Sequence, residues 1–354
     1  MNEQNKLLRL SVDSYQKGNK MGKKYQVYGL GNALVDFEIE TTIDQLTSLN
    51  IEKGVMTLIE EPRQDQLFDI FGKISHSRAC GGSAANTIIG AQTLGAQCYY
   101  SCKVASDETG QFYKQDLLNH GVHSNLSSEQ LTQGKTGKCL VLITDDADRT
   151  MNTFLGITGE IDYQQVDESA LLDSEYLYVE GYLSGSPTAQ IAAVKTMEFA
   201  KSNQIKTAFS LSDPNMVKFC REGLEQIIGQ GVDLLFCNYD EATEYSNTDN
   251  LDDAIVALLK ICQTLVVTLG PKGSVIVQQG QRIEIDGYDV EAIDSNGAGD
   301  LFAGSFLNAI TRGFDLEQAG RVASFASAQL VTQFGPRLNQ DNLTLVKNFA
   351  SSVA

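Results

Sequence analysis

Histidine and closely paired cysteine are both scarce in this sequence of 354 residues. Its three histidines, His76, His120 and His123, do not have the spacing of a metal-ligand set. Its seven cysteines are scattered, form no Cys-x-x-Cys pair, and in several cases lie in apolar, strand-like runs. Such a set predicts reduced, buried thiols rather than a disulfide framework, so we expect a cytoplasmic protein.

Long apolar runs and excess positive charge are also missing. No apolar span reaches the roughly 18 residues of a membrane helix. Residues 1–24 are too polar for a signal peptide, so we expect an N-terminal extension there. The 45 acidic residues outnumber the 27 basic ones, which gives a net charge of −18. Such a charge repels nucleic acids and anionic membranes, and neither is expected as a partner.

Three familiar nucleotide-binding motifs are incomplete or absent. Gly29-Leu-Gly31 begins like a dinucleotide fingerprint, but Leu34 replaces the third glycine and a strand is expected next. Gly134-Lys-Thr136 resembles the end of a Walker A loop, but Glu129 stands where the first glycine belongs. The HRD and DFG motifs of protein kinases are missing. These departures argue against a Rossmann site, a P-loop and a protein-kinase site.

What the sequence does contain is a regular alternation of strand and helix patterns from residue 25 onward. The alternation is typical of a largely parallel sheet with helices on both faces, and we predict a single domain over residues 25–354. Two segments, about 35–60 and 135–157, depart from this rhythm and alternate like half-exposed strands. Helices are expected at 61–74, 83–94, 108–120, 188–203, 214–229, 251–261, 298–312 and 316–334.

The most informative motif is a glycine-rich turn, Asp294-Ser-Asn-Gly-Ala-Gly-Asp300, followed by small apolar residues that predict a helix. The amides of Gly297, Ala298 and Gly299 would lie at the positive end of this helix, where they form an anion site. Asp300 stands in the first turn, beside the anion. A carboxylate there is costly unless it has a function, and taking a proton from a hydroxyl that attacks a phosphate is the obvious one.

A second glycine-rich segment, Cys80-Gly-Gly-Ser-Ala-Ala-Asn86, opens another expected helix. Paired glycines let the backbone approach a ligand closely, and the helix start points amides at it. Asn86 offers a donor and an acceptor to a sugar hydroxyl. Upstream, in Gly31-Asn-Ala-Leu-Val-Asp36, the carboxylate of Asp36 can accept hydrogen bonds from two vicinal hydroxyls, which suits ribose.

In this order, the two glycine-rich segments resemble the signatures of the ribokinase-like (PfkB) carbohydrate and nucleoside kinases. The resemblance covers nearly all of residues 25–340, and departs where Gly304-Ser305 replaces the two small residues, commonly two glycines, of relatives. It implies a three-layer α/β/α sandwich with a mostly parallel central sheet and a small β-sheet lid. The segments 35–60 and 135–157 would form the lid, unless they are two unrelated surface hairpins. It also implies ATP-dependent phosphoryl transfer with Asp300 as general base.

On the acceptor side, an Asp at the position of Asp36 holds ribose hydroxyls in this family. An Arg on the second lid strand, here Arg149, resembles one that adenosine kinases place near the transferring phosphate; a surface pair with Asp148 is the alternative. The residues that the resemblance places around the acceptor are Asn32, Leu34, Asp36, Gly81, Gly82, Ser83 and Asn86.

On the nucleotide side, Asn238-Tyr-Asp-Glu241 matches a family motif whose Glu orients Mg²⁺ through water. The same residues also predict a helix cap in which Glu241 is the capping-box partner of Asn238. The expected contacts with ATP come from Asn238, Glu241, Thr268, Gly270 and Gly273. Asp294, Ser295 and the turn Gly335-Pro-Arg337 resemble positions that hold a monovalent cation, so K⁺ dependence is expected.

The substrate class is harder to predict. The motif Gly-Gly-Ser-x-x-Asn and the run Arg149-Thr-Met-Asn-Thr-Phe-Leu-Gly156 look more like adenosine kinases than ribokinases. We therefore expect transfer to the 5′-hydroxyl of a nucleoside, adenosine first. The alternatives are a kinase for ribose, fructose or a related sugar, and a non-catalytic nucleoside-binding protein. An apolar inward face of the lid favours a nucleoside, and a polar one favours a bare sugar. The sequence is compatible with a monomer and with a homodimer.

Overall fold

The computed structural model describes residues 22–71, 77–127, 131–146 and 149–354, which contain two β-sheets. Residues 1–21 of the expected extension, residues 72–76 and Asp148 lie outside the described residues. The larger sheet comprises β1 (Tyr25–Leu30), β5 (Cys98–Ser101), β6 (His123–Ser124), β9 (Ser174–Glu180), β10 (Lys206–Ser210), β11 (Val232–Asn238), β12 (Cys262–Thr268), β13 (Ser274–Gln278) and β14 (Gln281–Ile285). The smaller sheet comprises β2 (Leu34–Glu40), β3 (Met56–Leu58), β4 (Ser77–Gly81), β7 (Thr136–Ile143) and β8 (Arg149–Gly156).

The larger sheet has the strand order β14-β13-β12-β11-β10-β9-β1-β5-β6. Its strands pair in parallel from β6 to β12, and the hairpin of β13 and β14 adds an antiparallel edge. Central strands such as β11 are buried along nearly their whole length, as expected when both faces of a parallel sheet are covered. The predicted α/β class with a mostly parallel sheet is confirmed.

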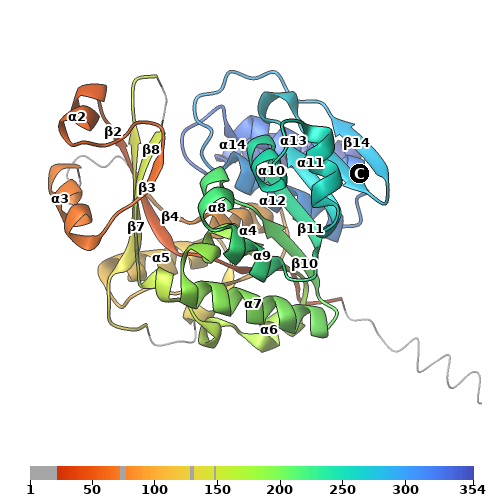
Figure 1. Cartoon of the computed structure of the whole chain (residues 1–354), viewed down its shortest axis with the longest axis horizontal. Coiled ribbons are helices and arrows are strands. Elements are labelled where there is room, and N and C mark those ends of the chain that lie inside the picture. The colour runs from red at the N-terminus through yellow and green to blue at the C-terminus, as the bar shows by residue number, and fades with distance from the viewer. Residues whose placement is uncertain (1–21, 72–76, 128–130, 147–148) are drawn as a thin grey trace, which may run out of the picture.

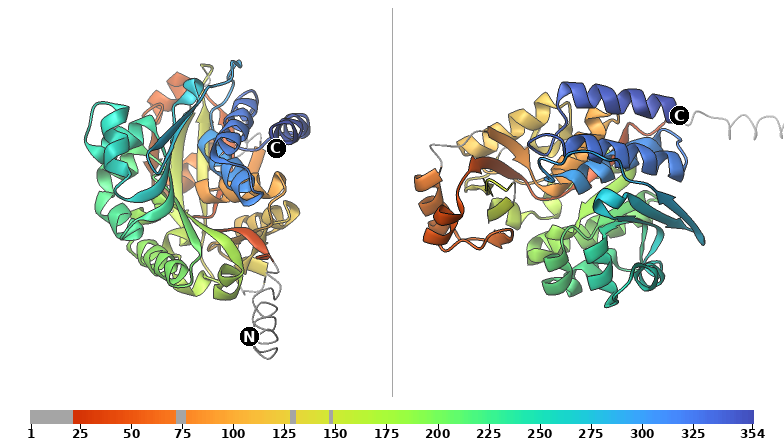
Figure 2. Two further views of the ribbon diagram at one scale, coloured as in Figure 1. Left: turned by 90° about the vertical axis from the view of Figure 1, so that its right-hand side faces the viewer. Right: turned by 90° about the horizontal axis from the view of Figure 1, so that it is seen from above.

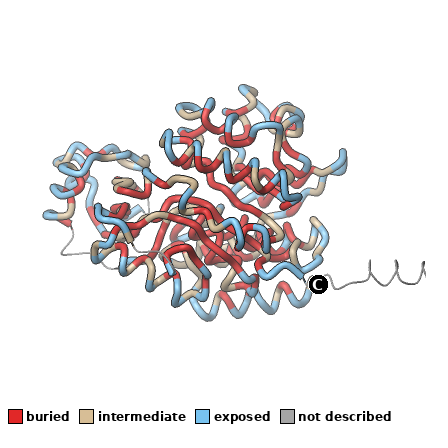
Figure 3. Tube along the Cα trace, turned by 90° about the horizontal axis from the view of Figure 1, so that it is seen from below, coloured by how far each residue is buried: buried red, intermediate tan, exposed pale blue. Residues whose placement is uncertain are grey.

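Helices cover both faces of the larger sheet (Figure 2). One layer contains α6 (Glu168–Leu172), α7 (Pro187–Ser202), α8 (Pro214–Phe219), α9 (Arg221–Ile228), α10 (Tyr239–Ser246) and α11 (Leu251–Leu258). The other contains α4 (Ser83–Thr93), α5 (Glu108–Asn119), α12 (Ala298–Thr311) and α13 (Leu316–Leu330), with α14 (Gln340–Val353) packed on α13. Figure 3 shows the buried residues concentrated along the strands between these layers.

Close approach of α4 and α12 determines how the two glycine-rich segments meet. A Cβ atom at Gly304 would lie only 2.3 Å from the carbonyl oxygen of Thr87, so the absence of a side chain lets the two helices touch. The neighbouring Ser305 is fully buried in this contact region. The beginnings of α4 and α12, where the two motifs lie, are therefore held side by side.

Some helix boundaries differ from the prediction. The expected helix 214–229 is two helices, α8 and α9, because the backbone leaves helical geometry at Cys220, next to a Phe219 that is 73% exposed and breaks the apolar stripe. Helix α13 ends at Leu330 rather than at 334. Helix α14 was not predicted; its N-cap is Asn339, whose side chain accepts a hydrogen bond from the amide of Asn342.

The smaller sheet has the order β3-β8-β7-β2-β4 and brings the two irregular segments together. Strand β2 pairs with β7, and β3 pairs with β8. Helices α2 (Ile43–Ser48) and α3 (Glu61–Phe71) pack on one face, on the side away from the larger sheet (Figure 1). The expectation of strands throughout 35–60 was wrong, since α2 interrupts them behind a capping box at Thr42. The fifth strand, β4, was not predicted, and Gly81 ends it.

Candidate active site

A cavity of about 390 Å³ lies between the two sheets. Its floor is formed where strands of the larger sheet end: Asn32 follows β1, and Glu180, Ser210, Asn238 and Thr268 end β9, β10, β11 and β12. The carboxyl ends of parallel strands are the usual place for ligands in open α/β sheets. Its roof is one face of the smaller sheet.

The glycine-rich turn before α12 lines this cavity with Gly297, Ala298 and Gly299. Gly297 caps the helix in the left-handed conformation, with φ of 73°, and a Cβ there would lie 2.8 Å from Pro336. The amide of Ala298 donates a hydrogen bond to the carbonyl oxygen of Ser295 at 3.2 Å, and it would have to share this bond with a bound anion. The first amides of a helix have no intrahelical partner, so the turn presents donors and the positive helix end to the cavity.

Asp300 joins the two glycine-rich motifs. The hydroxyl of Ser83 donates to its Oδ1 at 2.6 Å, and Nδ2 of Asn86 donates to its Oδ2 at 3.2 Å, across more than two hundred residues of sequence. Burial raises the pKa of Asp300 to about 6, although these two hydrogen bonds lower it. The carboxylate is thus held in a fixed position and is more basic than an exposed aspartate.

Asn86 retains one unused polar atom toward the cavity. Its Nδ2 donates to Asp300, while its Oδ1 is buried and has no hydrogen-bond partner within the described residues. A buried acceptor without a partner is unfavourable unless a ligand or water supplies a donor. Asn86 lines the cavity, so a ligand hydroxyl is a fitting partner.

The Gly81-Gly82 pair is required by close contacts with the β1–β2 region. A Cβ at Gly81 would lie 2.1 Å from Oδ2 of Asp36, and one at Gly82, whose φ is 97°, would lie 2.3 Å from the carbonyl oxygen of Asn32. Glycine therefore allows the strand end of β4 to pack directly against the Asp36 carboxylate. Gly82 lines the cavity and Gly81 lies behind Asp36.

Asp36 is buried, with 8% of its surface exposed, and it lines the cavity. Burial raises the pKa of Asp36 to about 7; the cation of Arg337 lowers it, while the carboxylates Glu38 and Asp300 raise it. Asp36 is therefore one of several buried carboxylates whose charges oppose one another in this site.

Glu180 is a prominent site residue that the sequence prediction missed. It is fully buried at the end of β9 and lines the cavity. Its Oε1 accepts from the backbone amide of Asn32 at 2.7 Å and from Nδ2 of Asn32 at 2.9 Å, and its Oε2 accepts from the amide of Ala84 at 2.6 Å. Burial raises the pKa of Glu180 to about 7, although these bonds lower it. A carboxylate ending an apolar parallel strand was the available signal.

Asn238 and Glu241 form the capping box that the sequence allowed. The amide of Glu241 donates to the side chain of Asn238 at 2.8 Å, and both Glu241 oxygens accept from Asn238, at 2.7 and 3.1 Å. Glu241 is 4% exposed and lines the cavity. Burial raises its pKa to about 8, with further raising by Asp213, Asp240 and Asp300. The cap is present, and the carboxylate also reaches the site.

Arg149 and Asp294 contact each other rather than the cavity. Nη2 of Arg149 pairs with Oδ2 of Asp294, and Nη1 lies 3.8 Å from Glu38. Asp294 also accepts from the amides of Asn296 and Gly335. The predicted contact of Arg149 with a transferring phosphate stays a prediction, and in this structure the guanidinium is paired with Asp294.

Most predicted site residues line the cavity, and a few do not. The lining includes Asn32, Leu34, Asp36, Gly82, Ser83, Asn86, Asn238, Glu241, Thr268, Ser295, Gly297, Ala298, Gly299 and Asp300. Gly81, Gly270 and Gly273 are not part of this lining. Gly273 serves the turn before β13 instead, since a Cβ there would lie 1.9 Å from the carbonyl oxygen of Ile285.

Two searches of the described residues gave negative results. Within those ranges, we found no group of three or more His, Cys, Asp or Glu side chains arranged to hold a metal ion. No helix in the same ranges has the length and apolarity needed to cross a bilayer.

Comparison with known proteins agrees with the geometry. Residues 74–343 match the family described as pfkB family carbohydrate kinase. An adenosine kinase of Saccharomyces cerevisiae is 27% identical over 342 residues, which cover 90% of this chain and 98% of that protein.

Solved structures extend the likeness to the whole fold. The adenosine kinase from Sinorhizobium meliloti is 32% identical, with a TM-score of 0.85 over 92% of this chain and 99% of that one. A probable sugar kinase from Rhizobium etli is 30% identical, with a TM-score of 0.86 over 94% of this chain and 100% of that one. The chain has the ribokinase-like fold, transfers phosphoryl groups to an alcohol, and belongs to the PfkB family of carbohydrate kinases.

Proposed function

We propose that this kinase transfers the γ-phosphate of ATP to the 5′-hydroxyl of a nucleoside, with adenosine as the preferred acceptor. The smaller sheet acts as the lid over the acceptor. Asp300 is the general base, and the amides of Gly297, Ala298 and Gly299 hold the transferred group. The similarity to two adenosine kinases supports this substrate class.

The observation that carries the nucleoside assignment is the chemistry of the lid's inner face. Strand register places Met56 beside Met151 and Met151 beside Val141, and it places Leu58, Thr153, Cys139 and Asp36 in the neighbouring row. Residues of alternate positions share one face of a sheet, and all of these line the cavity.

This inner face is apolar except at its ends. The Thr153 hydroxyl lies 3.3 Å from the sulfur of Cys139, to which it donates. Leu34 and Leu155 add two further apolar side chains to the cavity lining. A flat, apolar wall beside the hydroxyl-binding Asp36 suits a nucleobase attached to a ribose, whereas a bare sugar would leave that wall facing water.

The catalytic step uses groups that the structure holds in place. The Asp36 carboxylate accepts hydrogen bonds from the vicinal hydroxyls of ribose, and Asn86 Oδ1 accepts from another hydroxyl. Asp300 takes the proton of the 5′-hydroxyl as its oxygen forms a bond to the γ-phosphorus, and the bond from that phosphorus to ADP breaks. The helix start of α12 stabilises the negative charge on the transferring group.

The residues present fit ATP carried with Mg²⁺. No Lys or Arg belongs to the cavity lining within the described residues. Glu241 lines the cavity with both oxygens already accepting hydrogen bonds from Asn238, which suits contact with metal-bound water rather than direct ligation. Bound Mg²⁺ would neutralise phosphate charge there. Thr268 lines the cavity, and together with Gly270 and Gly273 in the turn that follows β12 it is the proposed contact for the nucleotide. Arg149 would have to leave its pair with Asp294 to reach the transferring phosphate.

A monovalent cation beside the anion site remains part of the proposal. Asp294 is 3% exposed and its side chain already has Arg149 and two amides as partners. Any K⁺ bound there would have to share this carboxylate or use carbonyl oxygens near Ser295. We further propose a cytoplasmic enzyme with small-molecule partners only, acting as a monomer or a homodimer.

A panel of acceptors tests the proposed function. Purified protein with Mg-ATP and K⁺ would be given adenosine, guanosine, inosine, ribose and fructose, and ADP formation measured. A preference for adenosine supports the proposal. A preference for ribose or fructose would contradict the nucleoside assignment and favour a sugar kinase, the class named for the similar Rhizobium etli protein. Binding of adenosine without turnover would contradict the kinase itself.

A further inference from the structure

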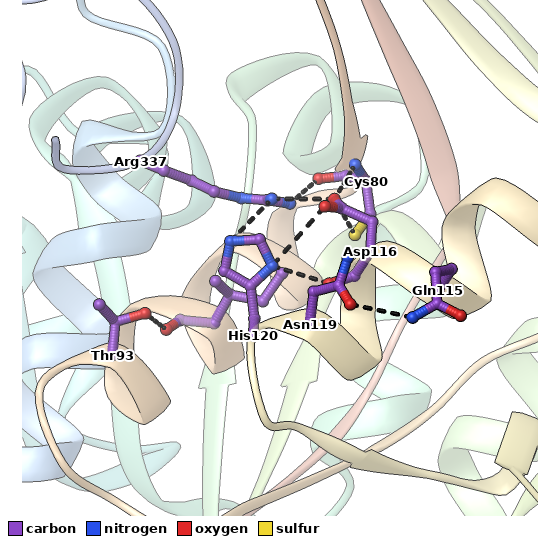
Figure 4. Close-up of polar contacts among 8 residues, drawn as sticks. Cys80, Thr93, Gln115, Asp116, Asn119, His120 and Arg337 are labelled. Carbon is purple, nitrogen blue, oxygen red and sulfur yellow. Dashed lines mark hydrogen bonds and ion pairs between the residues drawn. The ribbon is translucent and has the colours of Figure 1, made fainter.

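Arg337 lies outside the cavity lining, yet it contacts the strand that positions the acceptor-binding carboxylate. It belongs to the turn after α13, far along the chain from the smaller sheet. Its Nη2 donates to the carbonyl oxygen of Cys80, and its Nη1 donates to Oδ2 of Asp116 on α5 at 3.0 Å (Figure 4). Arg337 therefore joins a C-terminal turn to strand β4 and helix α5.

Asp116 completes the attachment of β4. The same Oδ2 accepts from the backbone amide of Cys80 and from its thiol, each at 2.9 Å. Cys80 is thus held at its amide, its carbonyl and its side chain by one ion pair. The Arg337 and Asp116 side chains are 18% and 19% exposed, so the pair is largely shielded from solvent.

From Cys80 the contact continues directly to Asp36. In the antiparallel register of β2 and β4, Cys80 lies opposite Val35, and Ala79 lies opposite Asp36. The next residue, Gly81, is packed against the Asp36 carboxylate so closely that no Cβ would fit. A shift of Cys80 would therefore move the backbone that confines Asp36.

The charge of Arg337 also acts on Asp36. The charged groups around Asp36 are Arg337 and Arg149, which favour its ionised form, and Glu38 and Asp300, which oppose it. Burial is the largest cause and raises the pKa of Asp36, and Arg337 is the largest of the influences that lower it. In a site whose lining contains several buried carboxylates, this cation has a direct electrostatic function.

His120 lies on the other side of Arg337, with its Nε2 3.4 Å from Nη1 of the guanidinium. Its Nδ1 lies 2.8 Å from the carbonyl oxygen of Asp116. The imidazole therefore packs between α5 and the Arg337 turn and adds a third contact to the cluster that holds Cys80.

We infer that Arg337 is a positioning residue for acceptor binding: it fixes strand β4 behind Asp36 and places a positive charge near that carboxylate. This rests on the proposed function only in that Asp36 binds the acceptor hydroxyls, and it holds for a nucleoside or a sugar. The turn that carries Arg337 also contacts the anion site, since the amide of Gly335 donates to Asp294 at 2.7 Å and Pro336 packs on Gly297. One segment, the turn that carries Arg337, therefore contacts both the strand behind the acceptor-binding Asp36 and the turn proposed to bind the phosphate.

The test compares Arg337→Gln and Arg337→Lys with wild type, and uses the exposed Arg312→Gln as matched control. We expect Arg337→Gln to raise the acceptor KM by about 10- to 100-fold, as misplacement of a binding group does. The KM for ATP should change little. Arg337→Lys, which keeps the charge without the second donor pair, should recover part of the loss.

A pH profile separates this function from a purely structural one. Acceptor binding needs ionised Asp36, so the acceptor KM rises as pH falls through the pKa of Asp36. Without Arg337 that rise should begin about 1 to 3 pH units higher. Asp116→Asn, which removes the anion beside Arg337, should not move the rise upward. It also serves as a second probe if Arg337→Gln fails to fold.

Clear results would overturn the inference. An unchanged acceptor KM, an equal loss for ATP, or an unmoved pH profile in folded Arg337→Gln would each contradict it. So would an upward shift in Asp116→Asn. If wild type prefers a bare sugar, the nucleoside proposal fails, but the acceptor KM of Arg337→Gln can still be compared with that of wild type by using that sugar. If wild type turns over none of the acceptors, the affinities of wild type and Arg337→Gln for adenosine and ribose are measured by calorimetry instead. Equal affinities in the two proteins would refute the positioning function of Arg337.

Discussion

Replacement of Glu180 by Gln tests whether this carboxylate is buried in its charged form at the floor of the site. Glu180 is fully buried and accepts three hydrogen bonds, two from Asn32 and one from Ala84. Gln has the same shape, but its amide has only one acceptor oxygen. If that oxygen keeps the two bonds to Asn32, the NH₂ group faces the amide of Ala84, where donor meets donor.

The expected stability change has two parts of opposite sign. Loss of the Ala84 bond leaves a buried donor unsatisfied, which costs about 1–3 kcal/mol. Against this, a pKa raised from 4.5 to about 7 means that ionised Glu180 destabilises the folded protein. Stability is therefore highest below the unfolded pKa of 4.5, and about 3 kcal/mol of it is lost as pH rises through about 7, where the buried carboxyl ionises. Gln has no such dependence.

Urea unfolding of wild type and Glu180→Gln at a series of pH values measures this. Between about pH 5 and about pH 8 the difference in unfolding free energy should shift by about 3 kcal/mol in favour of Glu180→Gln. The exposed Glu198→Gln serves as control and should show no such trend. A difference between wild type and Glu180→Gln that stays constant across this range would refute the reasoning, because Glu180 would then have an ordinary pKa.

Three further predictions concern the acceptor side and the base. Because burial raises the pKa of Asp300 to about 6, kcat in steady-state assays should fall about tenfold per pH unit below that value. Ser83→Ala removes a hydrogen bond that lowers this pKa, so the fall in kcat should begin at higher pH in that variant. Gly81→Ala places a Cβ 2.1 Å from Asp36 and should raise the acceptor KM about 100-fold, while ATP binding, measured by fluorescence titration, persists. Gly22→Ala, where a Cβ meets nothing within 4 Å, is the control. Equal acceptor KM values in Gly81→Ala and wild type would contradict the contact. Met151→Asn places an amide on the apolar inner face and should lower kcat/KM for adenosine about tenfold more than kcat/KM for ribose, and equal losses would argue against a base at that wall.

The two glycine-rich motifs were the part of the site that sequence reasoning could predict well. Each motif predicts a backbone geometry, an exposed helix start and a polar residue beside it, and all three depend on residues that are neighbours in the sequence. Their meeting, with the Ser83 hydroxyl 2.6 Å from Asp300, follows because α4 and α12 touch at Gly304. The capping box at Asn238 was predictable for the same reason, since it depends on residues three positions apart.

The contacts that could not be predicted are those between charged groups far apart in sequence. The apolar pattern of β9 indicates a strand, but only the folded chain shows that Glu180 meets Asn32 and Ala84. Likewise, nothing in the sequence near Arg149 indicates Asp294 as its partner. Alternation in the smaller sheet predicts which residues share a face, but not which face has α2 and α3 and which one lines the cavity.

Single-turnover transfer from ATP to adenosine by wild type and Asp300→Asn tests the central claim most directly. Asn keeps the size of the side chain and can remain bonded to Ser83 and Asn86, so adenosine affinity should be nearly unchanged. The rate of phosphoryl transfer should fall by about 10²- to 10⁴-fold, the usual contribution of a general base. A rate in Asp300→Asn close to that of wild type, with adenosine bound, would contradict the function assigned to Asp300.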